Sequence, residues 1–171
     1  MKYCLHCSGD VVVTGPGAYA CQKCEAKLYD NPIPGVSSFI LTDDEKVVLG
    51  VRAKEPQIGM LDGLGGFVDE GETLELALYR ELEEEGGIRK KDIAHIEYLT
   101  SVCDIYPWRP KAHKVTSAYF IVRLKPGVVL KPADDVSTIA TYELSDIDPE
   151  LFAWDGMRQA FNQFQKLFTD F

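Results

Sequence analysis

Hydrophobic and polar positions divide the chain into short apolar runs separated by polar or glycine-rich breaks. Runs rich in Val, Ile, Leu and Phe, which are typical of strands, cover residues 36–41, 47–51, 96–102, 115–124 and 139–144. The polar segment 42–46 predicts a turn between the first two strands. The segment 59–71 is rich in glycine and predicts a loop.

Two segments show a helical period instead. In residues 74–85 one apolar stripe is formed by Leu74, Ala77, Leu78 and Leu82, and Gly86-Gly87 predicts the C-terminal end of this helix. Residues 149–168 predict a second helix, whose stripe is interpreted as packing surface and contains Leu151, Met157, Ala160, Phe161, Phe164 and Phe168. Strands mixed with two helices predict an α+β fold.

The first 30 residues form a segment of their own, and residues 31–35 (Asn-Pro-Ile-Pro-Gly) are expected to break regular structure and act as a connector. Two C-x-x-C pairs, Cys4/Cys7 and Cys21/Cys24, flank a hairpin expected over residues 11–19 with a Gly-Pro-Gly turn. Four thiolates at this spacing suit one tetrahedral Zn²⁺ with no open position, so the metal is expected to be structural. A disulfide framework and a redox pair are the alternatives.

Composition limits the classes of function. The 171 residues carry a formal net charge of -9, which disfavours broad binding to nucleic acid. No run approaches the ~18 apolar residues of a membrane span, so no membrane partner is expected. The N-terminus lacks the apolar stretch of a signal peptide, so the chain is expected in the cytoplasm.

The strongest chemical signal is acidic. Glu81, Glu84 and Glu85 stand at positions i, i+3 and i+4 and therefore share one face of the first helix. Their mutual repulsion is removed by a hard divalent cation, and oxygen ligands suit Mg²⁺ or Mn²⁺. The alternative is a solvated acidic face without a ligand.

A longer pattern favours the metal site. It is G-x5-E-x7-R-E-U-x-E-E-x-G-U, with U aliphatic, and it is matched by Gly66, Glu72, Arg80, Glu81, Leu82, Glu84, Glu85, Gly87 and Ile88. This segment resembles the Nudix box, and the order of elements from residue 36 to 168 resembles a Nudix domain. The resemblance implies an α/β/α sandwich with a mixed sheet over residues 31–171. The four cysteines with the connector after them resemble the zinc-ribbon branch, which implies a zinc ribbon over residues 1–30.

The resemblance also implies roles for individual residues. Glu81, Glu84 and Glu85 would bind Mg²⁺ or Mn²⁺, with Arg80 pairing to them and the Gly66 backbone approaching metal and phosphate. Glu72 would brace the turn between loop and helix. Gly65 stands where family members commonly carry proline, and this departure is expected to touch no ligand. Water would attack one phosphorus, with a box glutamate or a later acid, Asp134 or Asp135, as the general base.

Substrate choice is expected to lie outside the box. Tyr106 and Trp108 fall in a segment expected to be a loop and could stack on a base, while Arg52 is a further candidate contact. The alternative is that these two aromatic rings only pack against neighbouring side chains. The resemblance implies hydrolysis of a nucleoside diphosphate linked to another group, with a small nucleotide such as ADP-ribose as substrate.

Two other functions stay open. One is a pyrophosphatase of NADH or of NAD-capped RNA, although the SQPWPFPxS stretch of that branch is absent. The other is a non-catalytic, nucleotide-binding regulator, which typically has an eroded box. The oligomeric state is also open, a homodimer being one alternative.

Overall fold

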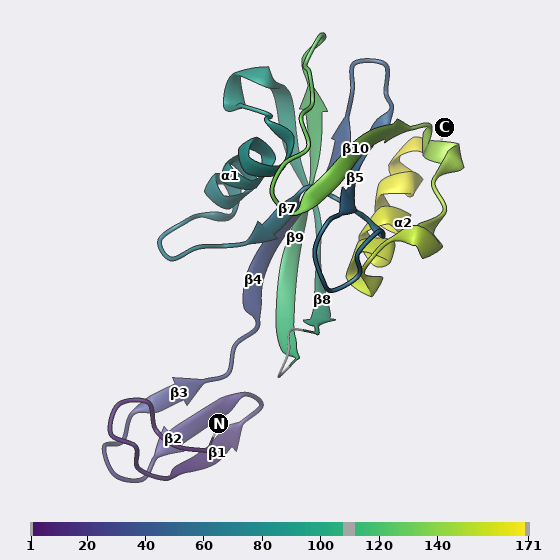
Figure 1. Cartoon of the computed structure of the whole chain (residues 1–171). Coiled ribbons are helices and arrows are strands. Elements are labelled where there is room, and N and C mark those ends of the chain that lie inside the picture. Colours follow the sequence, from purple (N-terminus) through teal and green to yellow (C-terminus); the bar gives the residue numbers. More distant parts are fainter. Residues whose placement is uncertain (1, 108–111, 170–171) are drawn as a thin grey trace. The chain divides into compact units, whose positions relative to one another are not determined.

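The structure is a computed structural model that describes residues 2–107 and 112–169. The chain separates into two compact units, Met1–Pro32 and Ile33–Phe171. Figure 1 shows the elements of both units. None of the helices in the described ranges has the length and apolar character needed to cross a membrane.

The N-terminal unit is a small antiparallel sheet in the order β1-β2-β3. Strands β1 (Val11–Gly15) and β2 (Ala18–Cys21) form the predicted hairpin. Its turn contains Gly17, whose φ of 65° is a left-handed conformation that glycine adopts without strain. Strand β3 (Lys27–Tyr29) was not predicted from the sequence. Among the described residues of this unit, the buried core consists of Cys4, Cys21 and Leu28.

The larger unit is built on a seven-stranded mixed sheet. Its main path runs in the order β10-β5-β4-β9-β8; β6 pairs with β5, and β7 pairs with β4. The strands are β4 (Ile33–Leu41), β5 (Val47–Arg52), β6 (Leu61–Asp62), β7 (Gly65–Phe67), β8 (Ile93–Tyr106), β9 (His113–Leu124) and β10 (Val136–Tyr142). Strands β4 and β9 are parallel, and the other pairs are antiparallel.

One helix packs on each face of this sheet (Figure 1). Helix α1 (Leu74–Gly86) packs Ala77, Leu78 and Leu82 against one core cluster, which includes Val36 and Ile40 of β4. Helix α2 (Asp155–Thr169) packs on the other face, where its phenylalanines meet Phe39. Because side chains alternate along a strand, neighbouring residues of β4 serve opposite cores. The predicted α/β/α sandwich is confirmed.

The prediction of irregular structure on both sides of the first hairpin of this unit, in segments 31–35 and 59–71, was partly wrong. Strand β4 begins at Ile33, inside the segment 31–35 that was expected to be irregular. Pro34 is tolerated near the strand start, where its carbonyl accepts from the Val68 N–H at 3.1 Å. The glycine-rich segment 59–71 likewise contains β6 and β7. These short strands form because β4 and β5 pair with each other over only two residue pairs, which leaves the rest of this side of each strand open to β7 and β6. Local sequence does not reveal this.

Both helices also differ from the predicted pattern at their first turns. Leu74 is 38% exposed because it is the first residue of α1, directly after the Thr73 cap, whose hydroxyl accepts from the Leu76 N–H at 3.3 Å. The second helix begins at Asp155, not at 149, and residues Pro149–Leu151 form a separate 3-10 turn. Leu151 is therefore not part of the packing stripe and is 50% exposed.

Candidate active site

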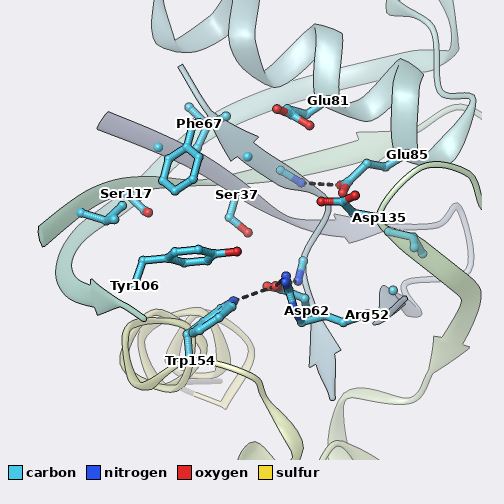
Figure 2. A pocket seen from close by; sticks show the side chains of 18 of the residues that line it. Ser37, Arg52, Asp62, Phe67, Glu81, Glu85, Tyr106, Ser117, Asp135 and Trp154 are labelled. Carbon is cyan, nitrogen blue, oxygen red and sulfur yellow. Dashed lines mark hydrogen bonds and ion pairs between the residues drawn. The ribbon is translucent and has the colours of Figure 1, made fainter. Parts of the chain in front are cut away.

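A cavity of about 320 Å³ opens beside the acidic end of α1. Figure 2 shows two glutamates and Asp135 on one side of this cavity and aromatic rings on the other. Strands β4 to β9, helix α1 and the segment around Asp135 all contribute to the lining. The cavity thus joins the residues of the box to residues far from it in sequence.

Arg80 organises the acidic side. Its Nε and Nη2 lie 2.9 Å from the two carboxylate oxygens of Glu72, and its Nη1 lies 2.7 Å from Glu81 and 3.1 Å from Glu84. Nη2 also donates to the Phe67 carbonyl at 2.9 Å. The Arg80 bond lowers the pKa of Glu72 to about 2, and the Asp69 N–H adds to this effect. Glu72 therefore braces the turn before α1, and Arg80 fixes two of the three glutamates.

Glu85 is the buried member of the set, with 5% exposure. Burial raises its pKa to about 8, and the charges of Glu81 and Asp62 add to the rise, against the opposing effect of a hydrogen bond from the Gly65 N–H. That bond is 2.8 Å long. Position 65, expected to touch no ligand, thus contacts one of the predicted metal ligands, because β7 begins beside the last turn of α1. A proline here would have no N–H to donate.

Gly66 allows the backbone to approach Glu81. A Cβ at position 66 would lie 2.3 Å from the Glu81 Oε1 and 2.7 Å from its Cδ. Burial raises the pKa of Glu81, although the Arg80 guanidinium opposes the rise. Carboxylates that are desolvated and mutually repelling form a donor set that suits a hard divalent cation. Their oxygens are not drawn into a tight cluster in the part of the chain that the structure describes, since Arg80 and Gly65 hold them.

Asp134 and Asp135 line the same cavity, so the fold brings the candidate bases to the box. Both are ion-paired with Lys54, at 2.8 and 2.5 Å. The hydrogen bond from Lys54 lowers the pKa of Asp134. Lys54 was not singled out from the sequence, because it lies about 80 residues away in the chain.

Rings form the opposite wall. Tyr106 lies between Phe67, at 5.4 Å between ring centroids, and Trp154, at 5.0 Å. Tyr106 is the last residue of β8, so the expectation of a loop at this position was wrong. It pairs with His113 in a long β8–β9 ladder, which explains the difference. Trp108, the other predicted ring, lies outside the described residues.

Asp62 holds this wall in place. Its Oδ2 accepts from the Trp154 Nε1 at 2.8 Å and from the Arg52 Nη1 at 3.0 Å, while its Oδ1 accepts from the Gly63 N–H at 3.0 Å. Burial raises the pKa of Asp62, against the effect of Arg52. Arg52 also donates to the Pro56 carbonyl at 2.9 Å, and its guanidinium lies 4.9 Å from the centre of the Trp154 ring. The predicted contact residue Arg52 therefore lines the cavity, with its Nε engaged by Pro56 and its Nη1 by Asp62.

Sequence reasoning missed Asp62 and Trp154. Asp62 could have been noticed as an acid between apolar Leu61 and the glycines that follow it. Trp154 was hidden inside the segment predicted as one long helix, whereas it precedes α2.

The N-terminal unit carries a second cluster. The sulfurs of Cys4, Cys7, Cys21 and Cys24 all lie within 4.8 Å of one another. The Sγ atoms of Cys4 and Cys24 are 3.7 Å apart, and those of Cys7 and Cys21 are 3.5 Å apart. These distances are close to the sulfur–sulfur distance of about 3.8 Å expected around a tetrahedral zinc with Zn–S bonds of about 2.3 Å. Backbone N–H groups of Cys24 and Lys23 lower the pKa of Cys21 to about 6, which favours its thiolate. The cluster fits zinc.

Comparison with known proteins agrees with this geometry. The family model described as NUDIX domain matches residues 31–164. The NAD-capped RNA hydrolase NudC of Escherichia coli O157:H7 is 31% identical over 134 residues, which are 78% of this chain and 48% of that protein. NudC of E. coli K12 strain DH10B is 30% identical over the same share of each chain. The chain thus spans about half the length of the curated relatives it matches.

Solved structures share the fold. A NUDIX hydrolase from Nitrosomonas europaea superposes with a TM-score of 0.69 at 23% identity, covering 97% of this chain and 91% of the other. The NUDIX domain of Shewanella oneidensis NrtR, complexed with ADP ribose, has a TM-score of 0.66 at 22% identity and covers 82% and 91%.

Proposed function

The chain belongs to the Nudix family, and from this premise we propose that it hydrolyses the pyrophosphate bond of a nucleoside diphosphate joined to a second group, using Mg²⁺ or Mn²⁺. One observation carries the proposal. The three glutamates of α1, with Arg80 bonded to two of them, line the same cavity as Tyr106 and Trp154. A charged end for phosphates therefore faces an apolar end for a planar ring.

The roles of the chain's own residues follow from their contacts. Glu81, Glu84 and Glu85 would hold the divalent cation, which would supply stabilisation of the charge that develops on the phosphates. Arg80 holds Glu81 and Glu84 in place, and the Gly65 N–H does the same for Glu85. These contacts order the box before any ligand binds, and the carboxylates would turn from Arg80 and Gly65 toward the cation when it enters.

The general base belongs to this proposal as well. Asp134 and Asp135 line the cavity, yet their shared pairing with Lys54 makes Asp134 a weaker base. The box glutamate Glu85 is buried and is held at the cavity by the Gly65 N–H instead of by a lysine. We therefore favour a box glutamate, with an acid of the later segment as the alternative. Loss of kcat in Asp134→Asn and Asp135→Asn without a change in metal affinity would reverse this order.

The substrate we propose is a small nucleotide of the ADP-ribose type. It is supported by the ring-lined end of the cavity and by the ADP-ribose complex of the NrtR domain, which has the same fold. The second candidate is the NAD-type pyrophosphate of NADH or of NAD-capped RNA, favoured by the identity to NudC. RNA with such a cap therefore remains to be tested as a partner, despite the net charge of -9.

The N-terminal unit is proposed to bind one structural Zn²⁺ through its four cysteines. Four protein ligands leave no position for substrate, so this ion would have no role in the chemistry. The core of the unit is too small to fold without such a cross-link.

The test is a phosphate-release screen of the full chain against ADP-ribose, NADH, NAD-capped RNA and other nucleoside diphosphates, with Mg²⁺ and with Mn²⁺. Glu84→Gln and Glu85→Gln should each lower kcat by at least ~10²-fold while the protein stays folded. Glu83→Gln is the matched control, because Glu83 lies on the same helix but is 62% exposed and pairs only loosely with Arg89 at 3.6 Å. Wild-type turnover in both variants, or no turnover of any substrate by the wild type, would contradict the proposal.

A further inference from the structure

On the face of the sheet that packs against α2, the side chains change from large and apolar to small where the helix begins. Along β4 this face carries Phe39 and Leu41 in the core, but then Ser37 and Gly35. Along β9 it carries Tyr119 in the core and then Ser117 at the cavity. Small polar residues thus replace large apolar ones, which leaves the room that the cavity occupies.

The start of α2 marks the boundary. Its Gly156 N–H donates to the Asp104 Oδ2 of β8 at 2.7 Å. Asp104 and Tyr106, two residues further on the same face of β8, both line the cavity. The small residues of β4 and β9 therefore form a floor, with the ring of Tyr106 facing it across the open space (Figure 2).

Ser37 stands out on this floor. Its side chain is directed into the cavity in Figure 2, it is only 9% exposed, and its Oγ is the buried side-chain polar atom that lacks a hydrogen-bond partner within the described ranges. A buried hydroxyl left in this state costs ~1–3 kcal/mol in desolvation. A Cβ at Gly63 would lie 2.7 Å from this oxygen, so the glycine at position 63 leaves space beside the hydroxyl.

Two carboxylates that line the same cavity as Ser37 are already engaged. Asp62 accepts from Trp154, Arg52 and Gly63. Asp104 accepts from the backbone N–H groups of Ile105 and Gly156. A ligand that enters between the floor and Tyr106 therefore finds the buried Ser37 hydroxyl uncommitted, and this hydroxyl can both donate and accept.

We propose that Ser37 is a specificity-determining residue, whose hydroxyl hydrogen-bonds a nucleobase bound in the space between the serine-glycine floor and the Tyr106 ring, with one edge of the base turned toward the hydroxyl. A planar heteroaromatic ring suits this site because it packs against an aromatic side chain and presents donors and acceptors at its edge. The inference rests on the proposed function for the class of ligand, but its test needs no hydrolysis.

The experiment compares Ser37→Ala with Ser38→Ala in the full chain with zinc bound. Ser38 is the matched control, because its hydroxyl faces the other way and donates to the Leu64 carbonyl at 2.9 Å. Binding of ADP, UDP and inorganic pyrophosphate is measured by titration calorimetry, and Tm is measured on the same samples. ADP and UDP distinguish a purine from a pyrimidine, and pyrophosphate has no base.

The two variants should affect different quantities, nucleotide affinity in one and Tm in the other. Ser37→Ala should weaken binding of the preferred nucleotide by about 3- to 10-fold, leave pyrophosphate unchanged and keep the wild-type Tm, since no protein hydrogen bond is lost. Ser38→Ala should lower Tm by about 2–6 °C and leave nucleotide affinity unchanged.

Three results would overturn the inference. One is unchanged affinity for both nucleotides in Ser37→Ala. Another is equal weakening for pyrophosphate, which would place the hydroxyl on a phosphate. The third is a fall in Tm like that of Ser38→Ala, which would make Ser37 a structural residue. A wild type that binds ADP but hydrolyses nothing would refute the proposed activity and leave this inference standing.

Discussion

Replacing Gly66 by alanine should strongly lower kcat while the protein stays folded. The added Cβ would lie 2.3 Å from the Glu81 Oε1, whereas carbon and oxygen in contact are separated by more than about 3 Å. The carboxylate is the far end of a flexible side chain, so it can retreat by about 1 Å from its place beside Arg80. The backbone itself needs no change, since Gly66 is not among the residues with positive φ.

The magnitudes follow from this geometry. A displacement of about 1 Å in a catalytic group can cost about 10²-fold in rate. The strained rotamer of Glu81 should cost ~0.5–1.5 kcal/mol. Loss of glycine's freedom in the unfolded chain offsets ~0.4–1 kcal/mol of this cost. We therefore expect kcat to fall by about 10²-fold and Tm to change by less than about 3 °C.

Gly65→Ala is the contrasting variant. A Cβ at position 65 would lie 2.2 Å from the Val36 carbonyl oxygen and 2.6 Å from the Ser37 Cα. Both are backbone atoms of β4 and cannot yield without opening the β4–β7 pairing. This variant should lose stability first, with a clear fall in Tm.

The assay is steady-state hydrolysis of ADP-ribose, or of the best substrate in the screen, with saturating Mg²⁺, together with Tm. If Gly66→Ala keeps kcat within about two-fold of the wild type, the position of the Glu81 carboxylate does not matter and the reasoning fails. If both glycine variants unfold to the same degree, the distinction drawn here between side-chain and backbone clashes is wrong.

Other predictions concern the ribbon, the brace of α1 and the ring wall. Protein purified without added zinc should contain about one equivalent, and Cys4→Ser with Cys21→Ser should abolish it; zinc retained in that double variant would refute the assignment. The pKa of Glu72 is lowered from 4.5 to about 2, so the stability from its pair with Arg80 is present above about pH 4.5 and is lost as pH falls toward 2. Glu72→Gln should therefore lower Tm at pH 7 and flatten its fall over that range, and parallel Tm curves would contradict this. Tyr106→Ala should raise KM by roughly ten-fold with a smaller effect on kcat, whereas a lower Tm with unchanged KM would make the ring a packing residue.

The sequence by itself was sufficient where the signal is local and periodic. The stripe of Ala77, Leu78 and Leu82 predicted α1, and the same helical period brings Glu81, Glu84 and Glu85 together near its C-terminal end, with Glu85 on the buried side. Glycine at position 87 marked the helix end, since its φ of 66° suits a residue without a side chain. The spacing of the four cysteines anticipated a cluster whose sulfurs do lie together.

Only the tertiary structure could decide what lies opposite the box. Asp62 and Trp154 are 92 positions apart and meet because β6 pairs with β5 while the chain before α2 returns to the same edge. The Gly65 contact with Glu85 and the unpartnered Ser37 hydroxyl likewise depend on how β7 lies against β4 and α1. Periodicity reports which face of an element is apolar, whereas a cavity is formed by elements whose pairing depends on long-range contacts that no local pattern encodes.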